Sequence, residues 1–327
     1  MKPGGDFSVI ITMSEGEDRK MRVRFVVTAV AVICMFAAAA SAAVEIHEKH
    51  RFDARPGATV VVDVSFHNVE VIARIGDSVD VTVDITVKGD GSTAKNVADD
   101  LQPKFLDEGD KLIIRSTRKK GWNWKSASAK GSVTVEMPPG MNLVVDSSSG
   151  SAEISGDFGD GIVRFDASSG SLTVDGAMSE LHSDTSSGSV RAAVMRPVDR
   201  FTADASSGSV RLVGGARDAK VDTSSGSINL AGLLGNAHFD ASSGSITAQW
   251  NSIPADAKVR AGASSGSVSL SFPAGTVLSG SVDVSSGNIR TDFPGTMEKK
   301  HLTLKGGSGA VDISVDTSSG SVKLLAN

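Results

Sequence analysis

The chain has 327 residues and a net charge of −5, from 33 basic and 38 acidic side chains, which argues against a general nucleic-acid binder because such proteins need a basic surface. Glycine is abundant at 35 residues, aromatic residues make up 5% of the chain and tyrosine is absent. This composition favours a thin core of small side chains over a thick globular core.

The N-terminal 42 residues predict export. Residues 1–20 are polar and unlike the rest, and we interpret them as an over-extended reading frame with Met21 as the true start. Residues 21–42 have two early arginines, an apolar run and a small Ala-Ser-Ala site, the order of a secretory signal peptide. The mature chain should begin at Ala43, keep no integral membrane segment, and lose Cys34, the one cysteine.

Residues 43–130 predict irregular first coils and an N-terminal cap. Apolar and polar residues alternate, as in half-buried strands, over 58–64, 69–73, 79–87 and 111–117. A short helix is expected over 93–101, with Ser92 or Thr93 as its N-cap. His47 and His50 are expected at a solvated end and not in a metal site.

Within this region, the segment 118–130 breaks the strand pattern and is expected to be an exposed loop. Trp122 and Trp124 lie here among basic residues that include Lys120 and Lys125. Paired aromatic rings with flanking cations suit a sugar, an anionic glycolipid or a protein, so these four residues are the predicted ligand contacts. The alternative is that both rings fold back and plug the open N-terminal end of the core.

Residues 131–327 repeat Ser-Ser-Gly-Ser, which predicts a solenoid of stacked coils. The glycines lie 18–22 residues apart, except for a last interval of 11, at Gly150, Gly170, Gly188, Gly208, Gly226, Gly244, Gly266, Gly287, Gly309 and Gly320. We expect two short strands per coil, a glycine turn such as Gly214-Gly215 or Gly232 at one end, and the Ser-Ser-Gly corner at the other. The short last interval predicts a hairpin or partial coil over 309–327.

The repeat columns assign an inner and an outer face to each coil. The residues two and four after each glycine are apolar and the one between is polar, which predicts a strand with one buried face. In the preceding strand, residues such as Val163 and Phe165 should point inward, and His182 and His238 outward. The corner glycine is expected to adopt a positive φ, a conformation that favours glycine.

An aspartate stands four residues before the glycine in most copies, at Asp146, Asp166, Asp184, Asp204, Asp222, Asp240, Asp283 and Asp316. One interpretation is a row of cation sites. The favoured one is an Asx-turn, in which each carboxylate accepts the backbone N–H two residues on. Calcium-binding solenoid repeats place aspartate after the glycines, so no metal ligand is predicted. The predicted structural corner is Gly170, Gly188, Gly208, Gly226, Gly244 and Gly266 with Asp166, Asp184, Asp204, Asp222 and Asp240.

Residues 45–327 resemble the bacterial DUF4097 family, labelled adhesins by analogy, and the related head-domain family of autotransporter-like adhesins. The resemblance rests on the strand sequences 59–71, 79–83 and 133–138 followed by the Ser-Ser-Gly-Ser coils. It implies a single-chain parallel β-helix in an exported or envelope protein, with no catalytic residues to carry over. Phe66-His67-Asn68 stands where relatives tend to have Asn-Gly, which affects the first turn.

Together these patterns predict an all-β, single-stranded parallel β-helix (β-solenoid) with about 18–22 residues per coil. We expect an exported, non-enzymatic structural, adhesin-like or binding module in the periplasm, envelope or extracellular space, without cofactor, metal or nucleic acid. Its partner is unknown; envelope glycan or protein are the candidates. The alternatives are a periplasmic sensor of a protein partner and a carbohydrate-active β-helix enzyme, which a clustered groove of acids would favour. Glu153, Asp175, Arg191 and Arg211 should lie together on one outer face, where they serve solubility.

Overall fold

The structure is a computed structural model that describes residues 43–116 and 127–327. The predicted signal peptide, Cys34 and the predicted ligand contacts Lys120, Trp122, Trp124 and Lys125 lie outside the described residues. No helix in the described part of the chain is long and apolar enough to cross a membrane.

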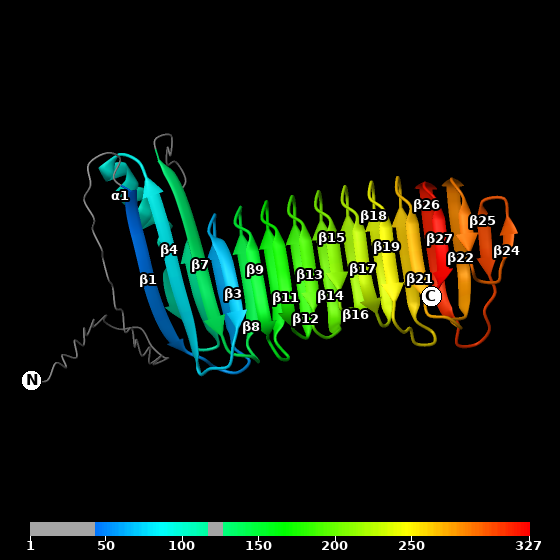
Figure 1. Cartoon of the computed structure of the whole chain (residues 1–327), viewed down its shortest axis with the longest axis horizontal. Helices are drawn as coiled ribbons and strands as arrows, with labels where there is room; N and C mark the ends of the chain where they lie inside the picture. Colours follow the sequence, from blue (N-terminus) through cyan, green and yellow to red (C-terminus); the bar gives the residue numbers. More distant parts are fainter. Residues whose placement is uncertain (1–42, 117–126) are drawn as a thin grey trace, which may run out of the picture.

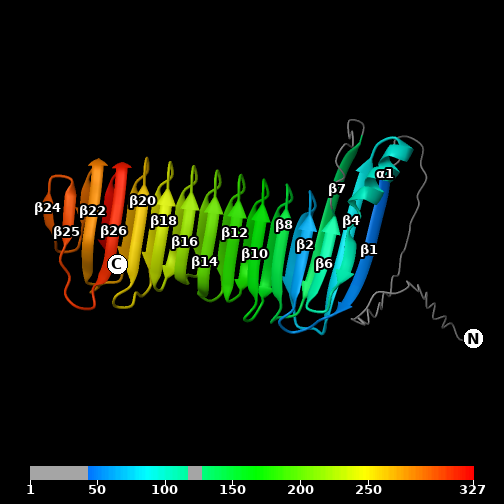
Figure 2. The ribbon, with the colours of Figure 1, turned by 180° about the vertical axis from the view of Figure 1, so that it is seen from behind.

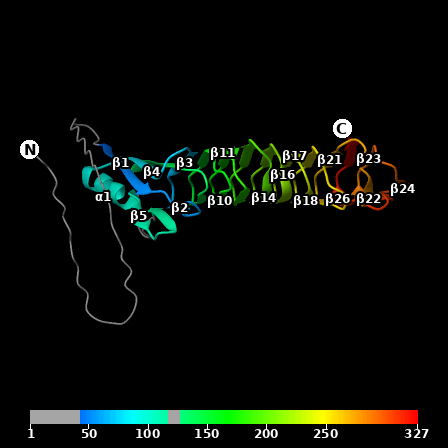
Figure 3. The ribbon, with the colours of Figure 1, turned by 90° about the horizontal axis from the view of Figure 1, so that it is seen from below.

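The chain forms a β-solenoid of two long, largely parallel sheets that lie face to face along the molecule (Figures 1, 2 and 3). In spatial order, sheet A contains β1 (Ala43–Asp53), β4 (Ser78–Lys88), β7 (Ser128–Met137), β3 (Asn68–Ala73), β9 (Ala152–Asp157), β11 (Leu172–Ala177), β13 (Val190–Val194), β15 (Val210–Val213), β17 (Ile228–Leu233), β19 (Ile246–Trp250), β21 (Val268–Phe272), β27 (Val322–Ala326) and β23 (Ile289–Thr291). Sheet B contains β24 (Thr296–Glu298), β25 (His301–Leu304), β22 (Leu278–Ser286), β26 (Val311–Ser319), β20 (Lys258–Ala263), β18 (Asn236–Ala241), β16 (Ala216–Thr223), β14 (Val198–Ala205), β12 (Glu180–Thr185), β10 (Ile162–Ala167), β8 (Asn142–Ser147), β2 (Thr59–Val64), β6 (Lys111–Ser116) and β5 (Lys104–Asp107).

The core lies between the two sheets and is made by alternate residues of each strand, as the repeat predicts. Val163 and Phe165 are buried, and so are the residues two and four after the corner glycine in the regular coils. Trp250 is fully buried near the C-terminal end, where its ring stacks on Phe272 with centroids 4.7 Å apart. Its indole nitrogen donates a hydrogen bond of 2.9 Å to the Gly235 carbonyl, so the buried polar atom is satisfied.

The N-terminal end departs from sequence order. The coil β2–β3 lies between β8–β9 and β6–β7, and β4 and β1 extend sheet A as antiparallel strands. The one short helix that was predicted is α1 (Gly91–Leu101), which buries Ala94, Val97, Ala98 and Leu101 and packs on β1 and β4. The predicted cap residues are wrong: the helix begins at Gly91 after Asp90, without a side-chain cap hydrogen bond.

The predicted hairpin or partial coil at the C-terminal end is also wrong. Residues 309–327 supply a complete coil, β26–β27, which inserts between β20–β21 and β22–β23 (Figure 1). Gly309 lies in the turn before β26, with φ 78°, and is not a corner. The interval of 11 residues therefore separates a turn glycine, Gly309, from a corner glycine, Gly320.

Most corner glycines are needed for space and not for a positive φ. Gly170, Gly188, Gly208, Gly226, Gly244, Gly266 and Gly320 are not among the positive-φ glycines, whereas the corner glycine Gly287 has a φ of 146°. On the opposite side of the coil, Gly214 in a turn and Gly232 within β17 have φ of 100° and 91°. A Cβ on Gly226 would lie 1.8 Å from the carbonyl oxygen of Gly208 in the preceding coil. Each corner therefore stacks backbone on backbone, and the prediction of positive φ is corrected by this close approach.

Candidate functional site

The outer face of sheet B carries a continuous row of aspartates, which we call the aspartate ladder. Strand register pairs each with the next, in the order Asp63, Asp146, Asp166, Asp184, Asp204, Asp222, Asp240, then Gly262, Asp316 and Asp283. Neighbouring parallel strands are about 4.8 Å apart, and the strands that carry these aspartates follow one another along sheet B (Figure 2), so the register places the aspartates in a regular line. The sequence did not predict Asp63 as a member of this row, because its coil has Phe66-His67 in place of the Ser-Gly of the repeat.

A cationic or imidazole side chain closes each end of the ladder. Arg115 on β6 is the register partner of Asp63, and its Nε lies 2.7 Å from the carboxylate. At the other end, Nδ1 of His301 on β25 lies 2.6 Å from Asp283. The interior of the ladder has no such charge placed opposite it in the same row.

Partial burial, together with the neighbouring carboxylates, raises the pKa values of four ladder aspartates, Asp146, Asp166, Asp204 and Asp316. For Asp166, partial burial raises the pKa first and the charges of Asp184 and Asp146 raise it further. The pKa of Asp204 is raised by burial and then by Asp184 and Asp222. Burial and one neighbouring aspartate also raise the pKa values of Asp146 and Asp316. The ionised ladder therefore repels itself, at a cost to the folded state.

The ladder does not pin the corners, so the predicted Asx-turns are wrong. In the coils that the structure describes, the corner bonds come from the next residue, which points inward: Thr185 Oγ1 donates to the Gly188 carbonyl at 2.7 Å and accepts from its N–H at 3.1 Å. Thr223 donates to Gly226 in the same way. The carboxylates point to the outer face because one residue along a strand reverses the side-chain direction.

A groove of about 600 Å³ opens along the C-terminal half of the ladder. Its lining includes Asp204, Asp222, Asp240, Asp283 and Asp316 together with serines and threonines of the corners. Gly262 is the one position of the row without a carboxylate, and a Cβ there would lie 2.5 Å from Asp240 Oδ1. Asp240 thus leans into the space that the glycine leaves.

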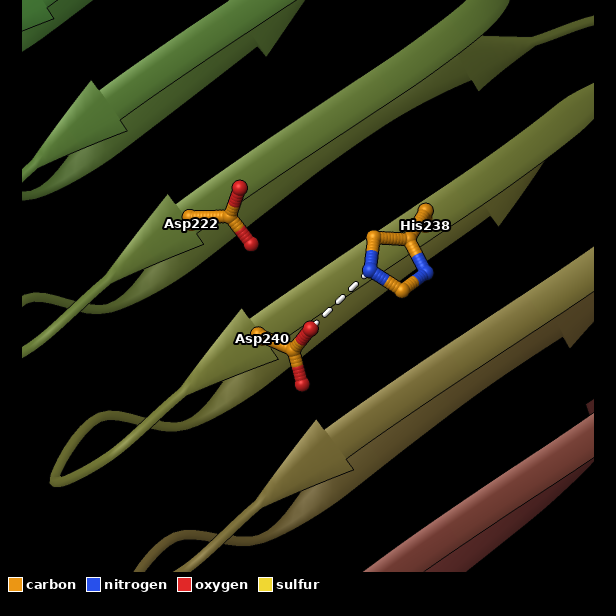
Figure 4. Close-up of side chains that lie close together, drawn as sticks. All are labelled: Asp222, His238 and Asp240. Atoms are coloured by element: carbon orange, nitrogen blue, oxygen red, sulfur yellow. Dashed lines mark ion pairs between the residues drawn. The ribbon is translucent and has the colours of Figure 1, made fainter.

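Beside this groove, one histidine joins two ladder aspartates (Figure 4). His238 Nε2 lies 3.0 Å from Asp240 Oδ2, and one ligand atom each from Asp222, His238 and Asp240 lie within 4.8 Å of one another. His238 and Asp240 are on β18 and Asp222 is opposite Asp240 on β16. His238 points outward, as predicted.

The outer face of sheet A has no comparable row. The positions matching Glu153 along this sheet are mixed in charge: Thr173, Arg191, Arg211, Asn229, Thr247, Ser269 and Lys323. Glu153, Asp175, Arg191 and Arg211 are all exposed there, as predicted. These four side chains lie on the exposed face of sheet A among residues of mixed charge, which fits the role in solubility that the sequence suggested.

Three N-terminal histidines occupy places that the sequence did not show. His47 and His50 lie in strand β1 and not at a free end: His47 Nδ1 is 2.6 Å from Asp84, and the His50 ring lies 4.1 Å from that of Phe105. His67 holds the corner position at which the next coil has Gly150. It is fully buried, and neither ring nitrogen has a partner with good hydrogen-bond geometry. Burial lowers its pKa to about 4, although the nearby Leu101 backbone acts in the opposite direction.

The chain matches the family described as Toastrack DUF4097 over residues 59–325. It belongs to that family. Toastrack DUF4097 is the family that the Ser-Ser-Gly-Ser coils and early valine strands resembled. No curated protein matches the chain.

Several solved structures are similar to this Toastrack chain. A "putative lipid binding protein" from Parabacteroides distasonis is 17% identical, with 85% of this chain and 96% of that chain covered and a TM-score of 0.48. A "putative adhesin" from Bacteroides fragilis is 12% identical, with 85% and 97% covered and a TM-score of 0.37. A "putative cell adhesion protein" from Clostridium sporogenes is 9% identical, with 86% and 100% covered and a TM-score of 0.24.

Proposed function

We propose that this chain is an exported, non-enzymatic module of the cell envelope or its exterior that binds a partner through the aspartate ladder. The observation that carries the proposal is a row of charges kept in register although it costs folding free energy. Raised pKa values at Asp146, Asp166, Asp204 and Asp316 report that cost, and the corners are held by other side chains. A feature that does not serve stability is best explained by binding.

The comparison with sheet A argues against solubility as the whole reason. Exposed polar residues of any kind keep a solenoid soluble, and sheet A achieves this with a mixture of serine, threonine, asparagine, arginine, lysine and glutamate. Among the described strands, sheet A repeats a charged residue over two adjacent coils at most in this row, as at Arg191 and Arg211, whereas sheet B repeats aspartate through most of its coils. The ladder offers acceptors at regular spacing, which suits lysine or arginine side chains. A basic segment of an envelope protein is the partner class that this chemistry favours.

The acidic groove makes a carbohydrate-active enzyme the second candidate. Glycosidases use two carboxylates about 5–9.5 Å apart, one with a raised pKa, and Asp204 beside Asp222 meets the coarse description. However, the groove lining contains no aromatic side chain on which a sugar ring could stack and no arginine or lysine. The same aspartate row also continues through coils outside the groove, so its repetition follows the coil and not the cavity.

A retention experiment tests the proposal. The purified chain is mixed with washed envelope fragments and sedimented, beside a variant with Asp166→Asn, Asp184→Asn and Asp204→Asn and a control with Glu153→Gln and Asp175→Asn on sheet A. We expect the ladder variant to lose retention and the sheet A variant to keep it. Equal retention of both variants would contradict the proposal, and release of reducing sugar by the wild type alone would favour the enzyme.

A further inference from the structure

We propose that Asp222, His238 and Asp240 form a binding site for one divalent transition-metal ion of the zinc class. The inference stands apart from the proposed partner of the ladder, because it concerns a single coil pair and a different ligand. It also reverses the expectation, drawn from the sequence, that this chain binds no metal.

The geometry of the three side chains is that of a nearly assembled coordination sphere. Ligand atoms about 2.0–2.2 Å from one ion lie about 3 Å apart when adjacent in that sphere. His238 Nε2 and Asp240 Oδ2 are already 3.0 Å apart, and the Asp222 carboxylate lies within 4.8 Å of both. A side-chain rotation that moves the Asp222 carboxylate by about 1–2 Å completes the set, with the remaining positions left to water.

The imidazole distinguishes this set from the rest of the acidic row. Carboxylates alone would attract hard cations such as calcium, which takes oxygen ligands. One imidazole nitrogen and two carboxylate oxygens are a mixed donor set that suits zinc, nickel or copper. Binding would also neutralise the repulsion between Asp222 and Asp240 on adjacent strands, so the ladder itself favours a cation at this place.

A second histidine in the same sequence context explains why only one coil pair converges. His182 also stands two residues before a ladder aspartate, Asp184, but its Nε2 pairs with Glu180 at 2.8 Å. The residue that corresponds to Glu180 two positions before His238 is Asn236, which is uncharged and whose Oδ1 accepts the Lys258 N–H at 2.9 Å. Because residue 236 is an asparagine and not a carboxylate, His238 pairs with Asp240.

The surroundings leave room for the ion and its waters. The groove of about 600 Å³ is lined by both Asp222 and Asp240, and Gly262 adds no further carboxylate at the next ladder position. The nearest competitor is Lys220, whose Nζ is 3.7 Å from Asp222 Oδ2. That lysine is more than half exposed and can swing into solvent when an ion takes its place.

Isothermal titration calorimetry of the tag-free, chelator-treated chain with zinc chloride tests the site. We expect saturable binding of one zinc ion. His238→Gln should weaken it at least about tenfold, since even residues behind the ligands contribute about 10–100-fold. His182→Gln is the matched control and should bind as the wild type does. Calcium chloride at the same concentrations should give no saturable heat.

Three results would overturn the inference. Zinc binding by His238→Gln equal to that of the wild type would mean that the ladder attracts cations as a diffuse polyanion. Equal losses in His238→Gln and His182→Gln would place the ion elsewhere. Absence of saturable zinc binding up to millimolar concentration would leave the three side chains as an ordinary surface ion pair. A far-ultraviolet circular dichroism spectrum of each variant checks that the solenoid is folded.

Discussion

Replacing one corner glycine by alanine should destabilise the solenoid far more than a typical surface substitution. In Gly226→Ala the new Cβ would lie 1.8 Å from the Gly208 oxygen, whereas ordinary Cβ contacts begin near 3.4 Å. The two coils must move apart locally by more than 1 Å. That separation weakens the corner bonds Ser225 N to Ser206 O, Val210 N to Ser227 O and Ser224 N to Ala205 O, which are 2.9, 3.0 and 3.3 Å long.

The expected loss is about 4–6 kcal/mol. Three weakened hydrogen bonds account for about 1 kcal/mol each, and overpacking of a close contact adds about 1–3 kcal/mol. Urea unfolding followed by circular dichroism measures the change. The control is Gly76→Ala, where nothing lies within 4 Å of the added Cβ and φ is not positive, and we expect a change within about 0.5 kcal/mol. If Gly226→Ala costs less than about 1 kcal/mol, close stacking does not explain the glycine.

Three further predictions concern the corner, the ladder and His67. Thr185→Val should cost about 1–3 kcal/mol because it removes both corner bonds to Gly188, whereas Asp184→Ala should change the unfolding midpoint little; the reverse order would restore the Asx-turn. Because the folded-state pKa of Asp204 is raised, its charge opposes folding at neutral pH, so Asp204→Asn should be more stable than the wild type at pH 7 and lose that advantage as pH falls through the raised pKa; an advantage that grows toward acid pH would contradict this. His67 has its pKa lowered to about 4, so the folded chain with a neutral imidazole keeps its full stability above about pH 6.5 and loses stability as pH falls toward 4. Between pH 6.5 and 4, the melting temperature of His67→Leu should therefore depend less on pH than that of the wild type. Identical dependence would argue against a neutral buried imidazole.

The regular part of the fold could be predicted because each coil repeats the same short pattern, a Ser-Ser-Gly-Ser corner followed by alternating apolar and polar residues. Alternation around Gly226 defines an inner and an outer face, and Gly214, with a positive φ, lies in the turn between β15 and β16 as predicted. Gly232 was predicted in a turn but lies within β17, at an irregularity of the strand register. The stacking order at the ends could not be predicted. That β2–β3 pairs with β8–β9, and β26–β27 with β20–β21, depends on long-range register that no local pattern contains.

The sequence predicted which aspartates form the candidate site, but the role it favoured for them, an Asx-turn at each corner, was wrong. The spacing of the aspartates placed them in one row, but an Asx-turn and an outward-pointing carboxylate have the same local sequence. The hydroxyls of Thr185 and Thr223 make the corner hydrogen bonds, so the preceding aspartate side chains point outward. The convergence of His238 on Asp240 depends on Asn236 upstream and on Asp222 across the sheet, and the second of these is a contact between coils.

Carboxylate footprinting tests the central claim, that the aspartate ladder is the binding face, most directly. The chain is labelled with a carbodiimide and glycine ethyl ester in the presence and absence of envelope fragments, and the labelled positions are read by mass spectrometry. The account predicts that modification of Asp166, Asp184 and Asp204 falls on binding while that of Glu153 and Asp175, exposed on sheet A, stays unchanged. Protection of the sheet A residues with the ladder still fully labelled would contradict it.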